Sequence, residues 1–271
     1  MRTALYSLFL LFTCQLQAQD QIWLKELKSH VYHIYEDSTD ELRSYHNEQF
    51  KSLLDSILLD PNSFTRKFDS LENLSVHKAP DNRFRIYTWT RPLIDGRFKY
   101  YGFVQIKPKK GEPFHIPLNE GGYSADAALE SELSAEEWYG ALYYKLIYHK
   151  HRRKRYYTLL GWRGEDSFVT SKLVDVITIN RQDEITFGKK MFVLDDKKKQ
   201  YRYIQRFGAN IYSSLRWDKR KKRIVMDHLV PSKDELEGIW QFYGPDFSYD
   251  ALEFKKGKWI LKEDVDVRNR E

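Results

Sequence analysis

Short segments rich in aromatic and β-branched residues recur along the chain from Phe84 onward, separated by turn residues at intervals of about ten positions. Phe84–Thr90, Phe98–Ile106 and Ala141–Tyr148 are examples. This spacing is typical of antiparallel strands joined by hairpins, whereas a doubly wound α/β fold would alternate its strands with long helices. The chain is therefore predicted to form an antiparallel meander.

The stretch from Tyr156 to Ile179 is the predicted middle of this sheet. Tyr156–Leu160 and Lys172–Ile179 have the composition of two apolar strands. The polar residues 161–171 between them predict a loop that exposes Trp162. Further along, Ile211–Trp217 alternates apolar and polar residues, which predicts another strand.

The N-terminal part has a helical pattern instead. Apolar residues recur at helical spacing over residues 20–35 and again over residues 42–58, and Pro61 ends the second run. Ser38 and Glu41 form a capping box that predicts the start of the second helix. A capping box at residues 134–137 predicts another short helix, which ends near Trp138.

These patterns together predict an α+β fold. A helical N-terminal segment, residues 19–80, is expected to pack on a large curved, mainly antiparallel β-sheet, residues 81–271, as one compact unit. The sequence leaves open whether this sheet closes partly into a barrel.

The first eighteen residues have the layout of a secretory signal peptide. A basic start is followed by the apolar run Ala4–Phe12 and a polar exit, and cleavage is predicted after Ala18. Lipidation at Cys14 is the alternative, which bulky Phe12 and the hydroxyl of Thr13 disfavour. The mature chain is therefore expected to be exported. No later segment is long and apolar enough to predict a transmembrane helix.

Cysteine usage and charge exclude several function classes. Cys14 is the single cysteine, so the mature chain would have neither disulfides nor thiol chemistry. The formal net charge of +6 is mild for a chain that is 31% charged, and no nucleic-acid-binding motif accompanies it, so no nucleic-acid partner is expected. No Gly-x-Ser-x-Gly, His-Glu-x-x-His or phosphate-binding loop is present. We therefore predict neither a cofactor nor an enzyme class.

Basic residues cluster where the predicted hairpins reverse direction. Such clusters usually keep sheet ends soluble, and they would bind a polyanion or lipid headgroup only if they lay at one end of the sheet. A strict meander puts the turns at 195–200 and 218–223 beside the Trp162 loop and the turn at 149–155 at the opposite end. This separation would not hold if a bulge at Gly208-Ala209 made residues 201–217 one bent strand.

Two groups of residues are candidate binding sites. The first is the loop of Trp162, Arg163, Glu165 and Asp166, because loops at sheet ends often carry function. In the alternative interpretation, the tryptophan covers the sheet end and the arginine pairs with a carboxylate.

The second candidate group lies near the C-terminus and combines a histidine with several carboxylates and tyrosines. Its members are Asp227, His228, Tyr243, Asp246, Tyr249 and Asp250. A histidine among carboxylates suits acid–base chemistry or a metal, whereas carboxylates that cap turns are the commoner case. The spacing fails as a calcium loop, because Ala251 replaces the required glycine.

His30 and His33 have helical spacing that suits a metal, but no third ligand is evident nearby in the sequence. They are therefore predicted to be surface histidines, and no metal site is predicted.

Six short motifs of this chain carry a family resemblance: Leu59–Phe64, Phe84–Trp89, Trp138–Tyr144, Tyr156–Trp162, Asp227–Leu229 and Tyr243–Asp250. They resemble a family of exported proteins of unknown function from Bacteroidetes-type bacteria. The resemblance implies a periplasmic or secreted location in a Gram-negative bacterium and brings no activity with it. In that family an Asp-Gly-Asn sequence often follows the tryptophan, whereas Arg163-Gly-Glu165 stands here, so a carboxylate role does not transfer to position 163.

Three functions remain open from the sequence. The first is a non-catalytic envelope protein that binds a partner or ligand through sheet-end loops. The second is a hydrolase of envelope polymers that uses Asp227, His228, Asp246 or Asp250, which requires His228 to lie near one of the last two. The third is a calyx for a hydrophobic ligand, which requires a closed barrel with an unfilled interior. The oligomeric state is not predicted.

Overall fold

The structure is a computed structural model that describes residues 21–194 and 198–267. The predicted signal peptide, with Cys14 and the cleavage point at Ala18, lies outside the described residues. The chain divides into two compact units, one up to Leu74 and one from Ser75 onward, which we call the helical unit and the β-unit. The division precedes the predicted boundary at residue 80, because residues 75–78 pair with the first long strand.

The helical unit contains a helix over residues 21–36, α2 (Asp40–Leu58) and the short 3₁₀ helix η1 (Pro61–Thr65). Thr39, rather than the predicted Ser38, caps α2, since its hydroxyl accepts a hydrogen bond from the Leu42 amide at 3.3 Å. The apolar stripe of α2 is buried at Phe50, Leu54, Ile57 and Leu58. Leu42 and Tyr45, which the periodicity assigned to the same stripe, are exposed.

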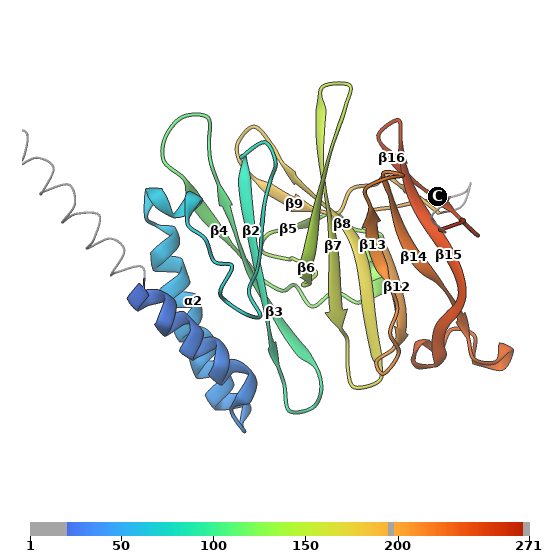
Figure 1. Cartoon of the computed structure of the whole chain (residues 1–271), viewed down its shortest axis with the longest axis horizontal. Helices are drawn as coiled ribbons and strands as arrows, with labels where there is room; N and C mark the ends of the chain where they lie inside the picture. Colours follow the sequence, from blue (N-terminus) through green and yellow to red (C-terminus); the bar gives the residue numbers. More distant parts are fainter. Residues whose placement is uncertain (1–20, 195–197, 268–271) are drawn as a thin grey trace, which may run out of the picture. The chain divides into compact units, whose positions relative to one another are not determined.

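The β-unit contains three antiparallel-rich sheets rather than the single sheet predicted (Figure 1). The first sheet has the order β1-β2-β3-β4. Its strands are β1 (Ser75–Lys78), β2 (Phe84–Pro92), β3 (Phe98–Ile106) and β4 (Phe114–Leu118). The predicted hairpin of Phe84–Thr90 with Phe98–Ile106 is confirmed by the pairing of β2 with β3.

The second, central sheet has the order β5-β9-β8-β7-β6, and β12 also pairs with β8. Its strands are β5 (Leu133–Ser134), β6 (Leu142–His151), β7 (Lys154–Gly164), β8 (Val169–Ile179), β9 (Ile185–Phe187) and β12 (Tyr203–Gly208). This sheet curls into a half-barrel. Its terminal strands β5 and β6 do not pair with each other in the described chain, so it does not close.

The third sheet has the order β11-β10-β16-β15-β14-β13, and β10 pairs with β16 in parallel. Its strands are β10 (Phe192–Val193), β11 (Lys199–Gln200), β13 (Leu215–Asp218), β14 (Arg223–Pro231), β15 (Tyr243–Lys255) and β16 (Lys258–Lys262). Short helices complete the β-unit: α3 (Ala125–Leu129), η2 (Asp234–Leu236) and η3 (Trp240–Phe242). The α+β class, with N-terminal helices and antiparallel-rich sheets, is confirmed.

Buried side chains cover both faces of the central sheet. Leu159 and Leu173 belong to the apolar core shared with the first sheet. Their sequence neighbours Leu160 and Val174 point to the other face, into the core shared with the third sheet. Because successive residues of a strand face opposite sides, a strand buried on both faces is apolar throughout. The stretch from Tyr156 to Ile179 is therefore the middle of the β-unit, as its composition predicted.

Two local predictions were wrong. Residues 133–134 form strand β5 rather than the start of a helix, because Ser134 pairs with Thr186 of β9. The predicted strand Ile211–Trp217 forms only from Leu215, and Ile211 itself is exposed. Alternation alone favoured a strand there, but residues 209–214 instead connect β12 to a strand of another sheet.

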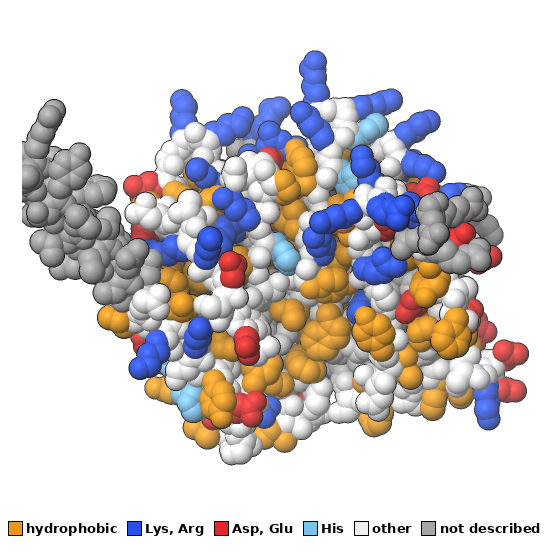
Figure 2. All heavy atoms as spheres, in the orientation of Figure 1, with side chains coloured by type: hydrophobic (Ala, Val, Ile, Leu, Met, Phe, Trp, Pro, Cys, Tyr) orange, Lys and Arg blue, Asp and Glu red, His pale blue; other side chains and the backbone are white. Residues whose placement is uncertain are grey.

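The predicted separation of the basic turns was also wrong. Gly257, in the turn between β15 and β16, lies beside His151 at the tip of the β6–β7 hairpin. Trp217, next to the β13–β14 turn, contacts His149 on β6 with ring centroids 5.5 Å apart. β12 runs toward the Trp162 end and β13 runs back, so the turn at 218–223 returns to the end of the 151–154 turn. Lys and Arg side chains gather along this end, at the upper edge of Figure 2.

Candidate functional site

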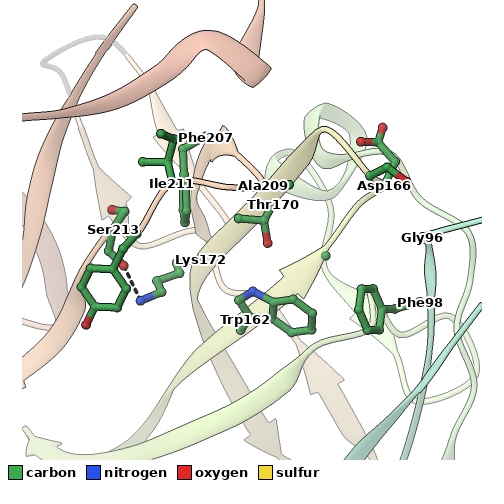
Figure 3. Close-up of a pocket in the computed structure, with 13 residues that line it drawn as sticks. Gly96, Phe98, Trp162, Asp166, Thr170, Lys172, Phe207, Ala209, Ile211 and Ser213 are labelled. Carbon is green, nitrogen blue, oxygen red and sulfur yellow. Dashed lines mark hydrogen bonds between the residues drawn. The ribbon is translucent and has the colours of Figure 1, made fainter. Parts of the chain in front are cut away.

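A pocket of about 490 Å³ lies at the opposite end of the β-unit from the basic turns. This volume is within the range of small-ligand sites. The walls come from the β2–β3 turn, the end of β7, the start of β8 and the segment around β12 and residues 209–213. Its lining residues include Phe98, Trp162, Thr170, Lys172, Phe207, Ile211, Tyr212 and Ser213 (Figure 3). We call it the Trp162 pocket.

Trp162 is not an exposed loop residue as predicted. It lies on β7 and is half-buried, and its ring packs edge-to-face on Phe98 with centroids 5.0 Å apart. Gly164 makes this contact possible, because a Cβ atom there would lie 2.7 Å from the Phe98 ring. The two rings therefore form a fixed aromatic wall, with Phe207 and Ile211 across the pocket from them (Figure 3).

Lys172 is the only lysine or arginine that lines the pocket in the described chain. It lies on β8 as the cross-strand neighbour of Trp162. Its ammonium donates a hydrogen bond to the Ser213 carbonyl and lies 5.2 Å from the centre of the Tyr212 ring. Desolvation lowers the pKa of Lys172, and the nearby Asp227 carboxylate opposes this shift. The pocket therefore combines apolar walls with one partly desolvated cation.

Arg163 and Glu165, which the sequence analysis grouped with Trp162, have structural contacts instead. The Arg163 guanidinium pairs with Glu120 at 2.9 Å and donates to the Tyr139 carbonyl at 2.7 Å. Glu165 accepts a hydrogen bond from the Ser171 hydroxyl. The alternative interpretation of Arg163, as the partner of a carboxylate, is the observed one.

Two further candidate carboxylates cap turns. Asp166 accepts hydrogen bonds from the amides of Phe168 and Val169 at 2.7 and 2.8 Å, which fixes the β7–β8 turn. Asp246 accepts from the Ser248 amide and hydroxyl, and these bonds lower the pKa of its carboxyl. Asp166 nevertheless lies at the pocket's edge, whereas Asp246 does not line it.

Asp227 holds the pocket's outer wall in place. Its carboxylate accepts a hydrogen bond from the Ser214 amide at 2.7 Å, and its carbonyl accepts from Gln205 at 3.0 Å. These bonds tie the segment before β13 to β14 and β12. Asp227 therefore supports Lys172 and the pocket wall without lining the pocket.

His228 and Asp250 form a close pair on β14 and β15. The His228 Nδ1 atom lies 2.8 Å from an Asp250 carboxylate oxygen, and this hydrogen bond raises the pKa of His228. The distance required for the hydrolase hypothesis is therefore met. Tyr249, which is half-buried beside them, pairs across the strands with Asp227.

Tyr243 lines a second pocket, of about 340 Å³, together with Pro231 and Phe242. Its hydroxyl accepts a hydrogen bond from the Gly238 amide at 2.9 Å. Ile211 lines both pockets, so the Tyr243 segment and the Trp162 pocket share a wall. His228, Asp246 and Asp250 line neither pocket. The second candidate group is thus divided between a pocket wall and a separate pair.

Sequence reasoning missed two residues of the Trp162 pocket and two residues of the helical unit. Lys172 and Phe98 belong to the pocket but were assigned only to strands. His46 and Asp37 lie beside His33 in the helical unit and supply the neighbours that His33 lacked in sequence. Two signals in the sequence were available. Lys172 is a charged residue within an apolar strand, and His33 and His46 lie one on each of two consecutive helices.

The fold and site define an α+β protein with antiparallel-rich sheets and an open, aromatic-walled pocket at one sheet end. No helix in the described part of the chain has the length and apolar character to span a membrane. Comparisons with protein-family models, with curated proteins and with solved structures found no match.

Proposed function

We propose that this chain is an exported, non-catalytic binding protein whose ligand or partner enters the Trp162 pocket with an aromatic or branched apolar group next to an acidic group. The signal-peptide layout of the first eighteen residues supports export. The pocket supports the binding role, because mostly apolar walls with one or two fixed polar groups are typical of ligand sites.

Lys172 is the observation that carries the proposed ligand class. Its ammonium uses one hydrogen bond on the Ser213 carbonyl, whereas an ammonium can donate three. An anionic group of a ligand would therefore meet a cation that is already partly desolvated. Trp162 and Phe98 would cover the apolar part of the same ligand.

Exposed apolar side chains around the pocket support a binding role for this end of the β-unit. Tyr212 is 82% exposed, and Phe168 in the adjacent turn is 66% exposed. Ile211 and Phe242 are also exposed, between the two neighbouring pockets. Contiguous exposed apolar residues on a water-soluble surface are typical of interaction sites.

The test uses the aromatic sulfonate dye 8-anilinonaphthalene-1-sulfonate, which has the proposed combination of an apolar body and an anionic group. We expect saturable binding to the native chain, measured by dye fluorescence. Lys172→Met keeps the apolar walls and removes the cation, so it should weaken binding, on the order of tenfold for the loss of one charge-assisted contact. Trp162→Ala should weaken it further.

The matched control is Lys233→Met, at an exposed lysine outside the pocket. Equal dye affinity for wild type, Lys172→Met and Trp162→Ala would contradict the proposed site. For a natural partner recovered by affinity capture, the double variant Trp162→Ala/Tyr243→Ala should reduce recovery, and unchanged recovery would reject the assignment of this end.

A hydrolase acting on envelope polymers is the second candidate, and the 2.8 Å contact of His228 with Asp250 is the observation that favours it. A carboxylate on Nδ1 orients the ring and leaves Nε2 as a general base. The His228 side chain is 37% exposed. If this function holds, His228→Gln abolishes hydrolysis of an isolated cell-wall polymer, whereas Lys172→Met preserves it.

A further inference from the structure

The helical unit brings three metal-ligating side chains, from two helices and the turn between them, into one cluster. Potential ligand atoms of His33, Asp37 and His46 all lie within 4.8 Å of one another. We propose that these three residues bind a divalent transition-metal cation of the zinc type, with His30 as the outer partner that orients His46. This site is independent of the Trp162 pocket and of the function proposed for it.

The local sequence holds two of the ligands together. His33 and Asp37 are one helical turn apart at the end of the first helix, and the Asp37 amide still bonds to the His33 carbonyl at 3.1 Å. Arg43 donates to the Asp37 carbonyl at 2.7 Å, which fixes the backbone of this residue from the second helix. Asp37 lies in the turn after the first helix, and these two hydrogen bonds fix its backbone to both helices.

The distances fit one bound cation. Zinc lies about 2.0–2.2 Å from nitrogen and oxygen ligands, so ligand atoms at tetrahedral angles lie about 3.4 Å apart. The His46 Nε2 atom is 3.6 Å from an Asp37 carboxylate oxygen, and the other Asp37 oxygen is 2.9 Å from the His33 Nδ1 atom. The His33 and His46 rings are stacked with centroids 4.3 Å apart, so the rings must turn out of this stack for both to present a ring nitrogen to one cation.

His30 completes the arrangement from the outside. Its Nδ1 atom lies 3.0 Å from Nδ1 of His46, which is the ring nitrogen that does not face Asp37. A ligand histidine characteristically donates its second ring N–H to an acceptor, and this contact selects the tautomer whose Nε2 lone pair is free for the metal. His30 therefore has the position of such an acceptor.

Two imidazoles and one carboxylate suit zinc and related cations rather than calcium or magnesium, which prefer oxygen ligands. Three protein ligands leave a coordination position open to water or to a further ligand. The His33 side chain is 39% exposed, so this position is accessible from solvent.

The test is a titration of metal-stripped, untagged protein with Zn²⁺ alone, followed by calorimetry and by thermal unfolding. We expect one high-affinity site per chain and a rise in Tm on zinc addition. Co²⁺ should give visible absorption typical of tetrahedral coordination. His46→Ala and Asp37→Asn should remove the site, and His30→Ala should weaken it about tenfold to a hundredfold.

The matched control is His151→Ala, at a histidine of the β-unit. Circular dichroism of each metal-free variant checks that the helices still form, so loss of binding is not loss of fold. Zinc binding that persists in both His46→Ala and Asp37→Asn, or that disappears in His151→Ala, would overturn the assignment. So would the absence of any Tm change with zinc in the wild-type chain.

A separate observation, the charge at one end of the β-unit, carries a second proposal. A groove at this end is lined by fifteen residues, of which eight are Lys or Arg and one is acidic. The lysines and arginines are Arg83, Lys109, Lys110, Arg153, Lys154, Arg155, Arg181 and Lys189. We call this groove, together with the adjoining tips Arg152, Lys219–Lys222 and Lys255–Lys258, the basic end.

Basic residues occupy strained positions at these tips. Arg152 and Arg153 form a two-residue turn with φ of 45° and 66°, where Asn-Gly is the favoured sequence. Lys222 and Lys256 also have positive φ, at 50° and 52°. Non-glycine residues are uncommon in this backbone region, so the tips hold positive charge at a conformational cost.

Part of this charge is not engaged in ion pairs. Arg155 pairs with Asp81 at 3.1 Å, Arg83 pairs with Asp183 at 2.8 Å, and Lys255 pairs with Glu253 at 2.6 Å. Among the described residues, no ion pair involves Lys109, Lys110, Arg152, Arg153 or Lys154, all of which are exposed. Lysine and arginine side chains thus gather at one end of the β-unit (Figure 2).

We propose that the basic end docks on the surface of an anionic phospholipid bilayer. The cations extend beyond the groove over the tips of hairpins from the central and third sheets, which suits a broad planar surface better than a single linear polymer. No large apolar residue is exposed at the hairpin tips 151–154, 218–223 and 255–258, so the contact would be electrostatic and reversible by salt.

The test is sedimentation of the chain with phosphatidylcholine vesicles, with and without phosphatidylglycerol. Binding should require phosphatidylglycerol and be lost at about 1 M salt, where the Debye length is about 3 Å. Arg152→Asn/Arg153→Gly removes two charges and supplies the favoured turn sequence. Since each basic residue near an anionic bilayer strengthens binding about fivefold, this variant should bind about 25-fold more weakly.

The same variant should raise Tm, because it relieves the two positive φ values, so weaker binding cannot result from unfolding. Lys99→Asn/Lys233→Asn removes two exposed charges elsewhere and should bind like the wild type. Equal vesicle binding by the two double variants would refute the proposal. So would binding to a soluble polyanion such as dextran sulfate without any binding to phosphatidylglycerol vesicles.

Discussion

Arg202 and Asp175 form an ion pair in the centre of the β-unit, and neither side chain is exposed at all. The Arg202 Nε atom lies 3.5 Å from an Asp175 oxygen, while the guanidinium also donates to main-chain carbonyls. These carbonyls belong to Ala128, Ser131 and Phe187. Asp175 in turn accepts from the Tyr143 hydroxyl at 3.1 Å. The pair therefore links α3 and the segment before β12 to strands β6, β8 and β9 of the central sheet.

Replacing Arg202 with methionine keeps a long side chain and removes the cation. Asp175 would then be a buried, unpaired carboxylate, which costs about 3–5 kcal/mol. Domains unfold with free energies of about 5–15 kcal/mol, so this loss is a large part of the total. At about 2–4 °C per kcal/mol for a chain of this size, Tm should fall by about 6–20 °C.

The assay is urea unfolding followed by tryptophan fluorescence, and it should include a double-mutant cycle. Arg202→Met/Asp175→Asn removes both charges and should recover at least about 1.5 kcal/mol relative to the sum of the single variants. Arg97→Ala removes an exposed partner of Asp95 and should change stability by less than about 1 kcal/mol. A loss below 1 kcal/mol for Arg202→Met, or additive single effects, would refute the argument.

Two further predictions concern the candidate sites. The Asp250 hydrogen bond raises the pKa of His228 above 6.5, so the stability from this pair is fully present below pH 6.5 and is lost as pH rises through the folded-state pKa. NMR titration should show the raised pKa and its return toward 6.5 in Asp250→Asn, and an unshifted His228 would contradict the assigned pair. Gly164→Ala should displace Phe98, since its Cβ would meet the ring at 2.7 Å, and should weaken dye binding in the Trp162 pocket. Gly238→Ala meets no neighbour within 4 Å but strains a backbone with φ of 83°, so it controls for backbone strain outside the pocket and should leave dye binding unchanged.

The parts of the fold that follow from local patterns could be predicted from the sequence. The β2–β3 hairpin and the strands on either side of residues 165–168 were readable because composition and turn residues agree there. The division into three sheets could not be predicted from the sequence, because alternation identifies a strand but not the strand with which it pairs. Residues 209–214 illustrate this, since they alternate like a strand but connect two sheets.

Of the residues that the sequence proposed for a site, only Trp162 and Asp166 line the Trp162 pocket. The position of Phe98 on β3 depends on the absence of a side chain at Gly164, which lies on β7 of another sheet, and no local pattern reports such a contact. Arg163 was grouped with Trp162 because they are adjacent, but adjacent residues of a strand face opposite sides. Had residues 161–164 been assigned to a strand, Arg163 would have been separated from the pocket in advance.

The β-unit presents different chemistry at its two ends, and the length of its strands predicts that the ends act independently. Strand β8 alone has 11 residues, and the steps from its first to its last residue span roughly 33 Å at about 3.3 Å per step. The Debye length at physiological salt is about 8 Å, so charges at the basic end are screened from Lys172. Arg152→Asn/Arg153→Gly should therefore leave dye affinity in the Trp162 pocket within about twofold of the wild type, and Lys172→Met should leave vesicle binding unchanged. Dye affinity that falls when phosphatidylglycerol vesicles are added, measured with vesicle-only controls, would contradict this independence and place both ligands on one surface.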